Sequence, residues 1–469
     1  MSIFTGIRKK IKNAFDNIHN ERVKQNLLQA IPFWLGSCIT GLVAVLYARL
    51  FAYAEEGSAY IFKHAAWSFF MITPVCFVIG WWLVKKYAPY SRGSGIPQVI
   101  AAIELANPRD NHKVDKLLSI RIIVVKIFSS LLVVFGGGVI GREGPTIQIA
   151  GSVFRKINQW LPAWWPKISR QNMIMTGAAA GLAAAFNTPL GGVVFAVEEL
   201  TKTHISYFKT ALFTAVIIAG LTAQALLGPY LYLGYPNVSD LSTWIFLPVI
   251  VVAVIAGLSG SLMSKLILVV FRWKRSFKNN YQYILYAVVC ALIIAAFGYF
   301  LGSTATGSGK EIMTTKLFTA EKGATWYEPL LRTAGPVITF TTGVAGGVFA
   351  PALASGASIG SAISGWFHVL PAEANLMMLC GMVAFLTGVT RTPFTSAILV
   401  LEMTDRHSVI FYLMLAGMVA GLVSMIVDKH SFYDHLKHQY IQELRGEENT
   451  APARAADAAN DNNTITKNT

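Results

Sequence analysis

Residues 136–151 read GGGVIGREGPTIQIAG and follow the apolar run IRIIVVKIFSSLLVVF at 120–135. They place Arg142 and Glu143 between glycines, at what the flanking sequence indicates is membrane depth. A charged side chain at the centre of a bilayer costs about 2.5–3.5 kcal/mol on insertion scales. Arg142 and Glu143 are therefore candidate functional residues. The remaining features of the sequence are needed to identify the function.

The composition is that of an integral membrane protein. Of the 469 residues, 54% are hydrophobic and only 13% charged, against about 25% charged in soluble domains, and the mean hydropathy is +0.51. Several apolar stretches are broken by Gly or Pro, so we expect an all-α membrane fold of many tilted, partly half-spanning helices. Stretches near or above the roughly 20 residues that cross a bilayer lie at about 29–53, 66–84, 119–140, 173–197, 210–233, 243–271, 281–302, 331–365, 376–402 and 409–427.

The net charge of +15 does not indicate a nucleic-acid partner. In a chain this apolar, basic residues flank the spans and fix their orientation. Residues 1–28 combine basic side chains with apolar ones at helical spacing, which predicts an amphipathic helix on the inner membrane surface, a cytoplasmic N-terminus and no signal peptide. Residues 441–469 predict a disordered polar tail. The lipid bilayer is therefore the first expected partner.

Two segments share one pattern, FNTPLGGVVFAVEE at 186–199 and TRTPFTSAILVLEM at 390–403. In each, Thr-Pro is followed by an apolar run and by a glutamate nine residues after the proline, Glu198 or Glu402. A Gly-rich loop ending in proline lies 44 residues before the first of these prolines (189 − 145) and 42 before the second (393 − 351). This predicts two membrane halves of one plan, residues 29–235 and 236–440, with the substrate at their interface. Whether the halves are parallel or inverted is left open.

Three loops have the same construction, GSGIP at 93–97, GREGP at 141–145 and GVFAP at 347–351. Glycine lets the backbone turn, proline suits the first helical turn, and an apolar run follows. Each loop therefore predicts a helix N-terminus with free N–H groups and partial positive charge. Three such ends would bind an anion without a lysine or arginine at the ion. Glycines that merely allow close helix packing are the alternative. This alternative suits Gly356 and Gly360. In the three loops the proline stands at the same place relative to the glycine that opens the loop, which favours the anion site.

Patterns typical of enzymes are weak or missing. Gly136, Gly138 and Gly141 satisfy GxGxxG without a βαβ context, and GSTATGSGKE at 302–311 has the wrong spacing for a P-loop. The sequence contains no HExxH and no paired-carboxylate hydrolase pattern. The four cysteines stand singly in apolar segments, which indicates buried small side chains rather than disulfides or zinc ligands. We expect no enzyme activity, no metal and no cofactor.

In this order and at these spacings, GSGIP, GREGP and GVFAP, with a tyrosine after the last span, resemble the chloride channel and chloride/proton antiporter (CLC) family over roughly residues 30–440. The resemblance implies a homodimer with one pore per subunit, each subunit made of two inverted halves. It implies that Glu143 is the gate and outer proton site. The implied chloride ligands are Ser94, the backbone amides of Val348 and Phe349, and Tyr433. The supporting motif positions are Gly93, Gly95, Pro97, Gly141, Arg142, Gly144, Pro145, Gly347 and Pro351.

A gate role for Glu143 also has a physical reason. At a helix N-terminus the ionised carboxylate can occupy an anion site, whereas the protonated group has no charge to hold it there. Its protonation should depend on an adjacent anion, because like charges disfavour ionisation, and this couples the two ions. A structural ion pair with Arg142 is the competing interpretation. It is disfavoured because adjacent residues at a helix start seldom face each other.

Glu198 and Glu199 end an apolar helix. The position of Glu198 is sufficiently explained if it marks the exit of the span into water. Its counterpart Glu402 is expected to have a structural role too. The resemblance implies that Glu199 is the inner proton-transfer residue of antiporters, which channel members typically lack. It therefore favours proton-coupled chloride antiport over the alternative, a passive chloride channel of the same fold.

Two positions depart from the family pattern. Gln98 stands where a glutamate often follows the proline, and Phe432 and Tyr433 compete for the tyrosine position one register step apart. Tyr433 is preferred because it carries a hydroxyl group. Ser94, GREGP and Tyr433 fit the chloride type rather than the fluoride type. The lack of a folded C-terminal regulatory domain suggests a bacterial inner-membrane member.

Overall fold

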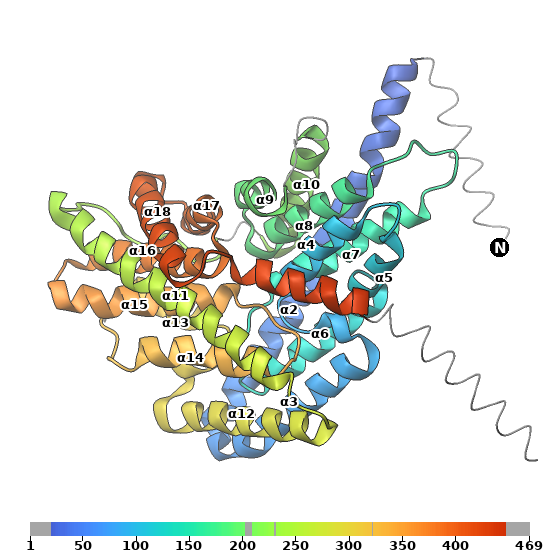
Figure 1. Ribbon diagram of the computed structural model, residues 1–469. Helices are drawn as coiled ribbons and strands as arrows, with labels where there is room; N and C mark the ends of the chain where they lie inside the picture. Colours follow the sequence, from blue (N-terminus) through green and yellow to red (C-terminus); the bar gives the residue numbers. More distant parts are fainter. Residues whose placement is uncertain (1–19, 202–208, 229–230, 321, 447–469) are drawn as a thin grey trace, which may run out of the picture.

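The computed structural model describes residues 20–201, 209–228, 231–320 and 322–446, which form helices joined by loops, with no β-strand among them (Figure 1). Seven helical stretches in this part of the chain are long and apolar enough to cross a membrane. The all-α membrane fold is therefore confirmed.

The first half of the chain contains α2 (Glu21–Ala65), α3 (Phe69–Tyr87), α4 (Ile96–Leu105), α5 (Asn111–Leu117), α6 (Ile120–Phe135), α7 (Glu143–Trp160), α8 (Arg170–Phe186), α9 (Pro189–Phe195) and α10 (Lys209–Leu227). The second half contains α11 (Phe246–Lys274), α12 (Asn280–Leu301), α13 (Lys310–Phe318), α14 (Glu328–Thr341), α15 (Phe349–Phe367), α16 (Pro371–Thr390), α17 (Pro393–Thr404) and α18 (Ile410–Val427), and a further helix covers residues 432–446.

Several apolar stretches contain two helices, as the glycines and prolines predict. Stretch 173–197 holds α8 and α9, and stretch 376–402 holds α16 and α17. The two breaks are alike, because α8 ends at Asn187 and α16 at Arg391, both with left-handed backbone (φ 58° and 65°), and Thr-Pro then starts the next helix. The N–H groups of the first helical turn have no partner within the helix, so a proline, which lacks an N–H, is well tolerated there.

The N-terminal end of the membrane part differs from the prediction. α2 begins at Glu21, with Asn20 as its N-cap, and continues to Ala65. Residues 21–28 therefore belong to the same helix as the first span, and the expected surface helix is otherwise confined to residues 1–19, outside the described part of the chain.

The C-terminal helix runs past the predicted boundary at residue 440. Residues 441–446 are helical because Ile441 and Leu444 are buried like Tyr433 and Tyr440 before them. The predicted tail from residue 447 onward lies outside the described residues.

Corresponding helices of the two halves occupy corresponding places. α7 packs against α8 as α15 does against α16, and α2 packs against α10 as α11 does against α18. α9 and α17 run antiparallel, since Glu198 beyond the end of α9 accepts hydrogen bonds at the start of α17, and Glu402 near the end of α17 accepts them at the start of α9. Antiparallel counterparts fit inverted rather than parallel halves. Figure 1 shows most helices of the first half on the right and most of the second on the left. The boundary at 235/236 stays a prediction.

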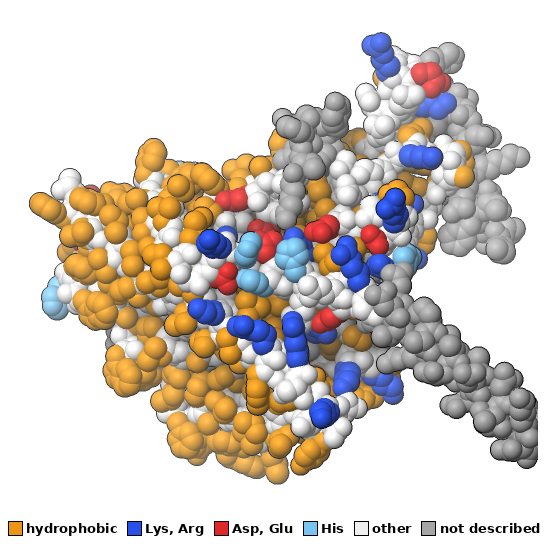
Figure 2. Space-filling view, in the orientation of Figure 1, with side chains coloured by type: hydrophobic (Ala, Val, Ile, Leu, Met, Phe, Trp, Pro, Cys, Tyr) orange, Lys and Arg blue, Asp and Glu red, His pale blue; other side chains and the backbone are white. Residues whose placement is uncertain are grey.

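The centre of the second half is the buried pair α15 and α16. A Cβ at Gly356 would clash with the Gly381 carbonyl, and one at Gly360 with the Met377 carbonyl, so the packing role expected for Gly356 and Gly360 is confirmed. Hydrophobic side chains cover the left and lower parts of the face in Figure 2, whereas charged and histidine side chains gather across its middle. The expectation of four buried cysteines is wrong for Cys38, which is exposed on α2. Lipid tails are as apolar as a protein core, so an apolar segment does not show whether its cysteine is buried in the protein or faces lipid.

Candidate functional site

Each of the three Gly–Pro loops leads into a helix N-terminus, as the sequence predicts. α4 begins at Ile96, α7 at Glu143 and α15 at Phe349. Gly95, just before α4, has a φ of 104°, a conformation that favours glycine. The first N–H groups of each helix have no partner within that helix. The buried prolines of these first turns are Pro97, Pro145 and Pro351.

The three loops are hydrogen-bonded to one another. Gly141 and Gly347 each donate an N–H to the other's carbonyl, at 2.8 and 2.7 Å. The Gly93 N–H donates to the Val344 carbonyl at 2.8 Å, and the Gly346 N–H donates to the Gly93 carbonyl at 3.1 Å. The loop before α15 therefore lies between the other two, and the three helix N-termini meet in one place.

Glycines without side chains allow this close approach. A Cβ at Gly144 would clash with the Ser94 hydroxyl, and one at Gly347 would lie 3.0 Å from the Pro145 ring. Ser94 therefore faces the first turn of α7 directly.

Glu143 is the first residue of α7 and is only 1% exposed. The Tyr232 hydroxyl donates a hydrogen bond to its Oε1 at 3.2 Å, whereas Oε2 has no hydrogen-bond partner among the described residues. Oε2 lies over Gly141, where a Cβ would clash with it. Arg142 precedes α7 and interacts electrostatically with Glu143. A carboxylate held at a helix N-terminus stands where an anion would bind.

Two buried hydroxyl groups lie beside this place. The Tyr433 hydroxyl is close to that of Ser94, yet neither oxygen has a hydrogen-bond partner in the described part of the chain. The Tyr433 ring stacks on that of Phe349, with centroids 6.4 Å apart and an interplanar angle of 16°. The ring of Phe432 packs instead against that of Phe340 at 5.7 Å. Hydroxyl groups buried without partners are donors that an anion could satisfy.

The buried Lys126 of α6 is a residue that the sequence analysis missed. Its Nζ donates to the Gly93 carbonyl at 3.0 Å and lies close to Gly95, so it holds the loop before α4. It places a lysine amino group near a site that was expected to have no lysine at the ion. The available signal was a lone lysine inside the apolar run at 120–135.

Glu198 and Glu402 form a reciprocal pair of helix caps. Glu198 Oε2 accepts hydrogen bonds from the N–H and the hydroxyl of Thr395 at 2.6 and 2.7 Å. Glu402 accepts from the N–H groups of Leu190 and Gly191 at 3.0 and 2.7 Å. The structural role expected for both glutamates is confirmed.

Glu199 has different surroundings from its neighbour. It lies half-buried in the π-helical turn Ala196–Leu200 that continues α9. It interacts electrostatically with Tyr433.

Gln98, the departure from the family pattern, is buried in the first turn of α4. Its Nε2 donates to the carbonyls of Arg92 at 2.6 Å and Tyr90 at 3.2 Å. An ionised glutamate has no N–H to donate to these carbonyls. These two hydrogen bonds therefore explain why an amide, rather than a carboxylate, stands at position 98.

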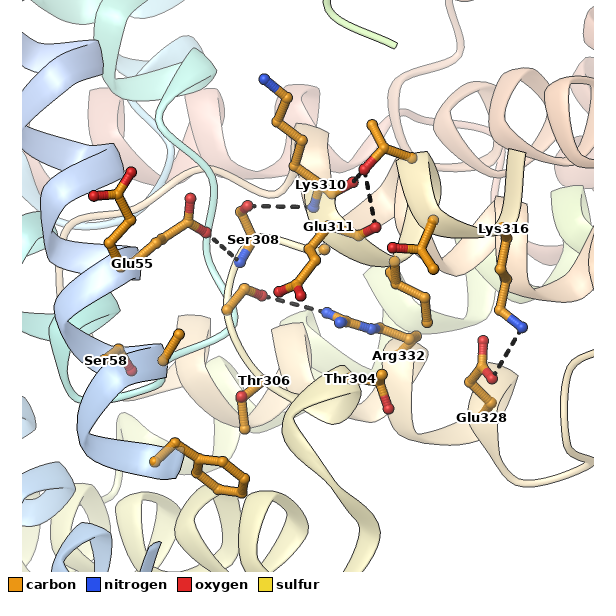
Figure 3. A pocket seen from close by; sticks show the side chains of 18 of the residues that line it. Glu55, Ser58, Thr304, Thr306, Ser308, Lys310, Glu311, Lys316, Glu328 and Arg332 are labelled. Carbon is orange, nitrogen blue, oxygen red and sulfur yellow. Dashed lines mark hydrogen bonds and ion pairs between the residues drawn. The ribbon is translucent and has the colours of Figure 1, made fainter. Parts of the chain in front are cut away.

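A cavity of about 840 Å³ with several charged side chains in its lining lies beside the site, between α2, α13 and the segment before α13 (Figure 3). The Glu55 carboxylate accepts a hydrogen bond from the Ser308 N–H at 3.0 Å, and Lys316 pairs with Glu328 at 3.3 Å. Lys310 also lines the cavity, and its Nζ lies 4.7 Å from the centre of the Tyr232 ring. The segment rejected above as a P-loop is thus the wall of this cavity, which we call the Glu55 cavity.

Inverted halves, long apolar helices and helix ends that meet at a buried carboxylate are typical of membrane proteins that carry ions. The chain belongs to the voltage gated chloride channel family, which it matches over residues 75–425.

Three solved structures have the same fold. A slow cyanobacterial Cl⁻/H⁺ antiporter is 23% identical, with a TM-score of 0.77 over 88% of this chain and 97% of the other. A CLC-type fluoride/proton antiporter is 22% identical, with a TM-score of 0.71 over 88% of this chain and 98% of the other. A eukaryotic CLC transporter is 18% identical, with a TM-score of 0.71 over 88% of this chain and 74% of the other.

Proposed function

We propose that this protein exchanges chloride for protons across the membrane and that Glu143 is its gate. The observation that carries the proposal is the buried Glu143 carboxylate at the meeting point of three helix N-termini. Ionised, it occupies an anion position; protonated, it loses the attraction of the helix end and yields to chloride. Two of the similar structures are of proton antiporters, one for chloride and one for fluoride.

Chloride is bound by donors on the Tyr433 side of the gate. The hydroxyls of Ser94 and Tyr433 and the backbone amides of Val348 and Phe349 are the proposed ligands, since the two hydroxyls lack partners in the described residues and the amides start α15. Glu199 is the proposed inner proton-transfer residue. The proposed outer mouth is the Glu55 cavity, whose Lys310 reaches the ring of Tyr232, the hydrogen-bond partner of Glu143.

A passive chloride channel of the same fold is the second candidate. It would leave Glu199 without a role in transport, which is why antiport is preferred. Chloride rather than fluoride is the proposed substrate, because Ser94 and Tyr433 fit the chloride type of the family.

The test is Glu143→Gln in liposomes, with chloride and proton movement measured together. Glutamine keeps the size of the side chain but neither ionises nor carries a proton. Chloride flux should persist and become nearly independent of pH, and a chloride gradient should no longer drive protons uphill. In the unmodified protein, flux should rise as the pH falls, because protonation releases the carboxylate.

Three other outcomes would contradict the proposal. Coupled proton movement that survives in Glu143→Gln would exclude this gate. General loss of folded protein or of flux would favour a structural ion pair with Arg142. Chloride flux without proton movement in the unmodified protein would favour the channel.

We further propose a homodimer with one pore per subunit, in a bacterial inner membrane with the N-terminus in the cytoplasm. The mass of the purified protein in detergent and protease accessibility of the N-terminus in oriented vesicles test these two points. A monomer with unchanged flux, or an N-terminus cleaved from outside, would contradict them.

A further inference from the structure

We propose that Tyr232 and Lys310 form an outer latch that holds ionised Glu143 in the anion position and so sets the pH at which the gate opens. The inference rests on the gate role of Glu143 proposed above. It assigns a role to two residues outside the three loops, one in the connection between α10 and α11 and one at the start of α13.

Tyr232 contacts the gate directly and is held rigidly. It is 3% exposed, and its hydroxyl donates to Glu143 Oε1 at 3.2 Å. Its ring packs edge-on against Phe186, with centroids 5.1 Å apart, and Phe186 in turn packs against Phe349 at 6.2 Å. The next residue, Leu233, donates its N–H to the Met403 carbonyl at 3.1 Å, which ties the segment to α17. The phenol therefore reaches Glu143 from a fixed position.

Lys310 strengthens this contact through the ring of Tyr232. Its Nζ lies 4.7 Å from the centre of the Tyr232 ring. A cation over an aromatic face draws electron density from the ring, which makes the phenol a stronger hydrogen-bond donor. The ammonium group also interacts with Glu143 itself. Both effects favour the ionised carboxylate over the protonated one.

Other charged and titratable groups also face Glu143. Arg142 precedes it on its own helix, Glu55 reaches it from α2 across the Glu55 cavity, and Lys310 reaches it from α13. The phenols that interact with it are Tyr47, Tyr232 and Tyr433. The Tyr47 hydroxyl is hydrogen-bonded to Ser130 at 2.6 Å, and the Tyr433 hydroxyl lies at Ser94. Tyr232 is the phenol whose hydroxyl is hydrogen-bonded to the carboxylate.

The latch has a measurable consequence. A hydrogen bond to a charged group favours that charged form, so its loss favours protonation and release of Glu143. Tyr232→Phe keeps the ring on Phe186 and removes only the donor. The pH of half-maximal chloride flux should rise by about one unit, a tenfold change in proton affinity, with the maximal flux at low pH unchanged. Tyr232 is a positioning residue, since the proton and the anion bind elsewhere.

Three variants make the experiment specific. Lys310→Gln should also raise the pH of half-maximal chloride flux. Lys310→Arg keeps the charge and should leave that pH at the value of the unmodified protein. Tyr286→Phe is the matched control, because the Tyr286 hydroxyl is hydrogen-bonded to the Thr341 hydroxyl at 2.7 Å, away from the gate. It should leave the midpoint where it is.

The double variant Glu143→Gln/Tyr232→Phe separates the latch from the gate. If Tyr232 acts through Glu143, the double variant should show the pH profile of Glu143→Gln alone. An unchanged midpoint in Tyr232→Phe, or a shift that persists in the Glu143→Gln background, would overturn the latch while leaving the gate intact. A pH-dependent Glu143→Gln protein would overturn the gate and the latch together.

Discussion

Ser94 and Tyr433 each bury a hydroxyl group without a hydrogen-bond partner in the described residues. Such a group costs about 1–3 kcal/mol in a folded protein. Two of them side by side, at the start of α15, are explained if a ligand supplies the missing acceptor. A chloride ion accepts hydrogen bonds from any direction, so it suits hydroxyls that approach from different elements.

Replacing Ser94 tests this explanation. Ser94→Pro removes the hydroxyl donor and leaves one coordination position of the halide empty, so preference should shift from chloride toward nitrate. Loss of one hydrogen bond to an ion corresponds to about a tenfold change in relative flux. The measurement is the ratio of chloride to nitrate flux in liposomes. An unchanged ratio would remove Ser94 from the list of ligands.

Glu199 and Glu198 offer a comparison between adjacent residues. Glu199→Gln should keep chloride movement and lose proton movement, because the amide cannot carry a proton. Glu198→Gln should affect proton movement much less, since Glu198 is engaged at the start of α17. Both ions are measured in the same liposomes. If the two variants behaved in reverse, the inner proton residue would be assigned one position too late.

The residues of the site differ in how far the sequence could reveal them. Gly93, Gly141 and Gly347 stand in loops whose glycines and prolines predict a helix start, because that pattern is local. Tyr232 stands 89 residues from its partner Glu143, and nothing in its own segment marks it. Only the packing of α8 and α13 around its ring brings it to the gate.

At the scale of elements, α9 and α17 each start with unpaired N–H groups that the other helix satisfies. A carboxylate at a helix N-terminus is stabilised by both hydrogen bonds and the helix dipole. Because each helix provides the acceptor for its partner, the two form one unit between the halves. The same repeat that marks the chain in sequence therefore also joins its halves.

Glu402→Gln should weaken this unit. It removes the charge that accepts from Leu190 and Gly191, at a cost of about 1–2 kcal/mol. The midpoint of thermal unfolding in detergent should fall. Glu21→Gln is the matched control, since the Glu21 side chain is 72% exposed and its ion pair with Lys24 contributes little. Equal midpoints for the two variants would show that the cap does not stabilise the fold.

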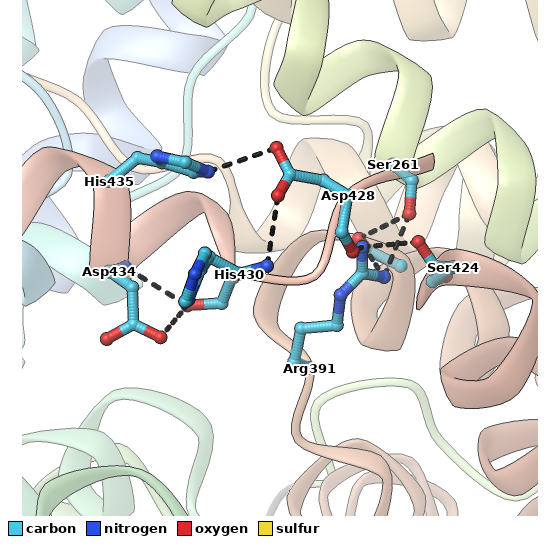
Figure 4. A network of polar contacts seen from close by, with 9 residues as sticks. Ser261, Arg391, Ser424, Asp428, His430, Asp434 and His435 are labelled. Atoms are coloured by element: carbon cyan, nitrogen blue, oxygen red, sulfur yellow. Dashed lines mark hydrogen bonds and ion pairs between the residues drawn. The ribbon is translucent and has the colours of Figure 1, made fainter. Parts of the chain in front are cut away.

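The linker between α18 and the C-terminal helix is tied at both ends (Figure 4). Arg391 Nη2 donates to the carbonyls of Ser424 at 2.6 Å and Asp428 at 2.9 Å. The Asp428 carboxylate accepts from the His430 N–H and lies 3.0 Å from His435 Nε2. Since Tyr433 lies in the first turn of the helix that this linker leads into, these contacts help to position its ring.

Asp428 gives the linker a pH dependence. Burial opposes its ionisation, but the hydrogen bond from His430 and the charge of His435 outweigh burial, so the pKa of Asp428 lies below its usual range. A lowered pKa means that the stabilisation is present above the unfolded-state value of about 3.9 and is lost as the pH falls below it. Asp428→Asn should therefore unfold about 1 kcal/mol more easily at pH 7. The difference should shrink as the pH falls from about 4 through the lowered folded-state pKa, and a difference that does not depend on pH would exclude this origin.

At the scale of the whole molecule, the two halves could be predicted because Thr-Pro and the Gly–Pro loops recur about 205 residues apart. Their relative direction could not, because a repeated sequence has the same order of residues in either orientation. The reciprocal contacts of Glu198 and Glu402 supply the missing direction. The full length of α2 could not be predicted either, because Glu55 and Glu56 end the apolar run but not the helix.

α2 has 45 residues and, at 1.5 Å per residue, measures about 68 Å, more than twice the roughly 30 Å of a bilayer's hydrocarbon core. A rod of that length has to tilt or project beyond the lipid, and its inclination is set by the helices packed against it, α6, α7, α8 and α10. Glu55 sits near one end of this rod and is bonded to the segment before α13. Any movement of α2 relative to these helices would therefore be transmitted through Glu55 to the wall of the Glu55 cavity, so that one long helix joins the lipid-facing surface to this cavity.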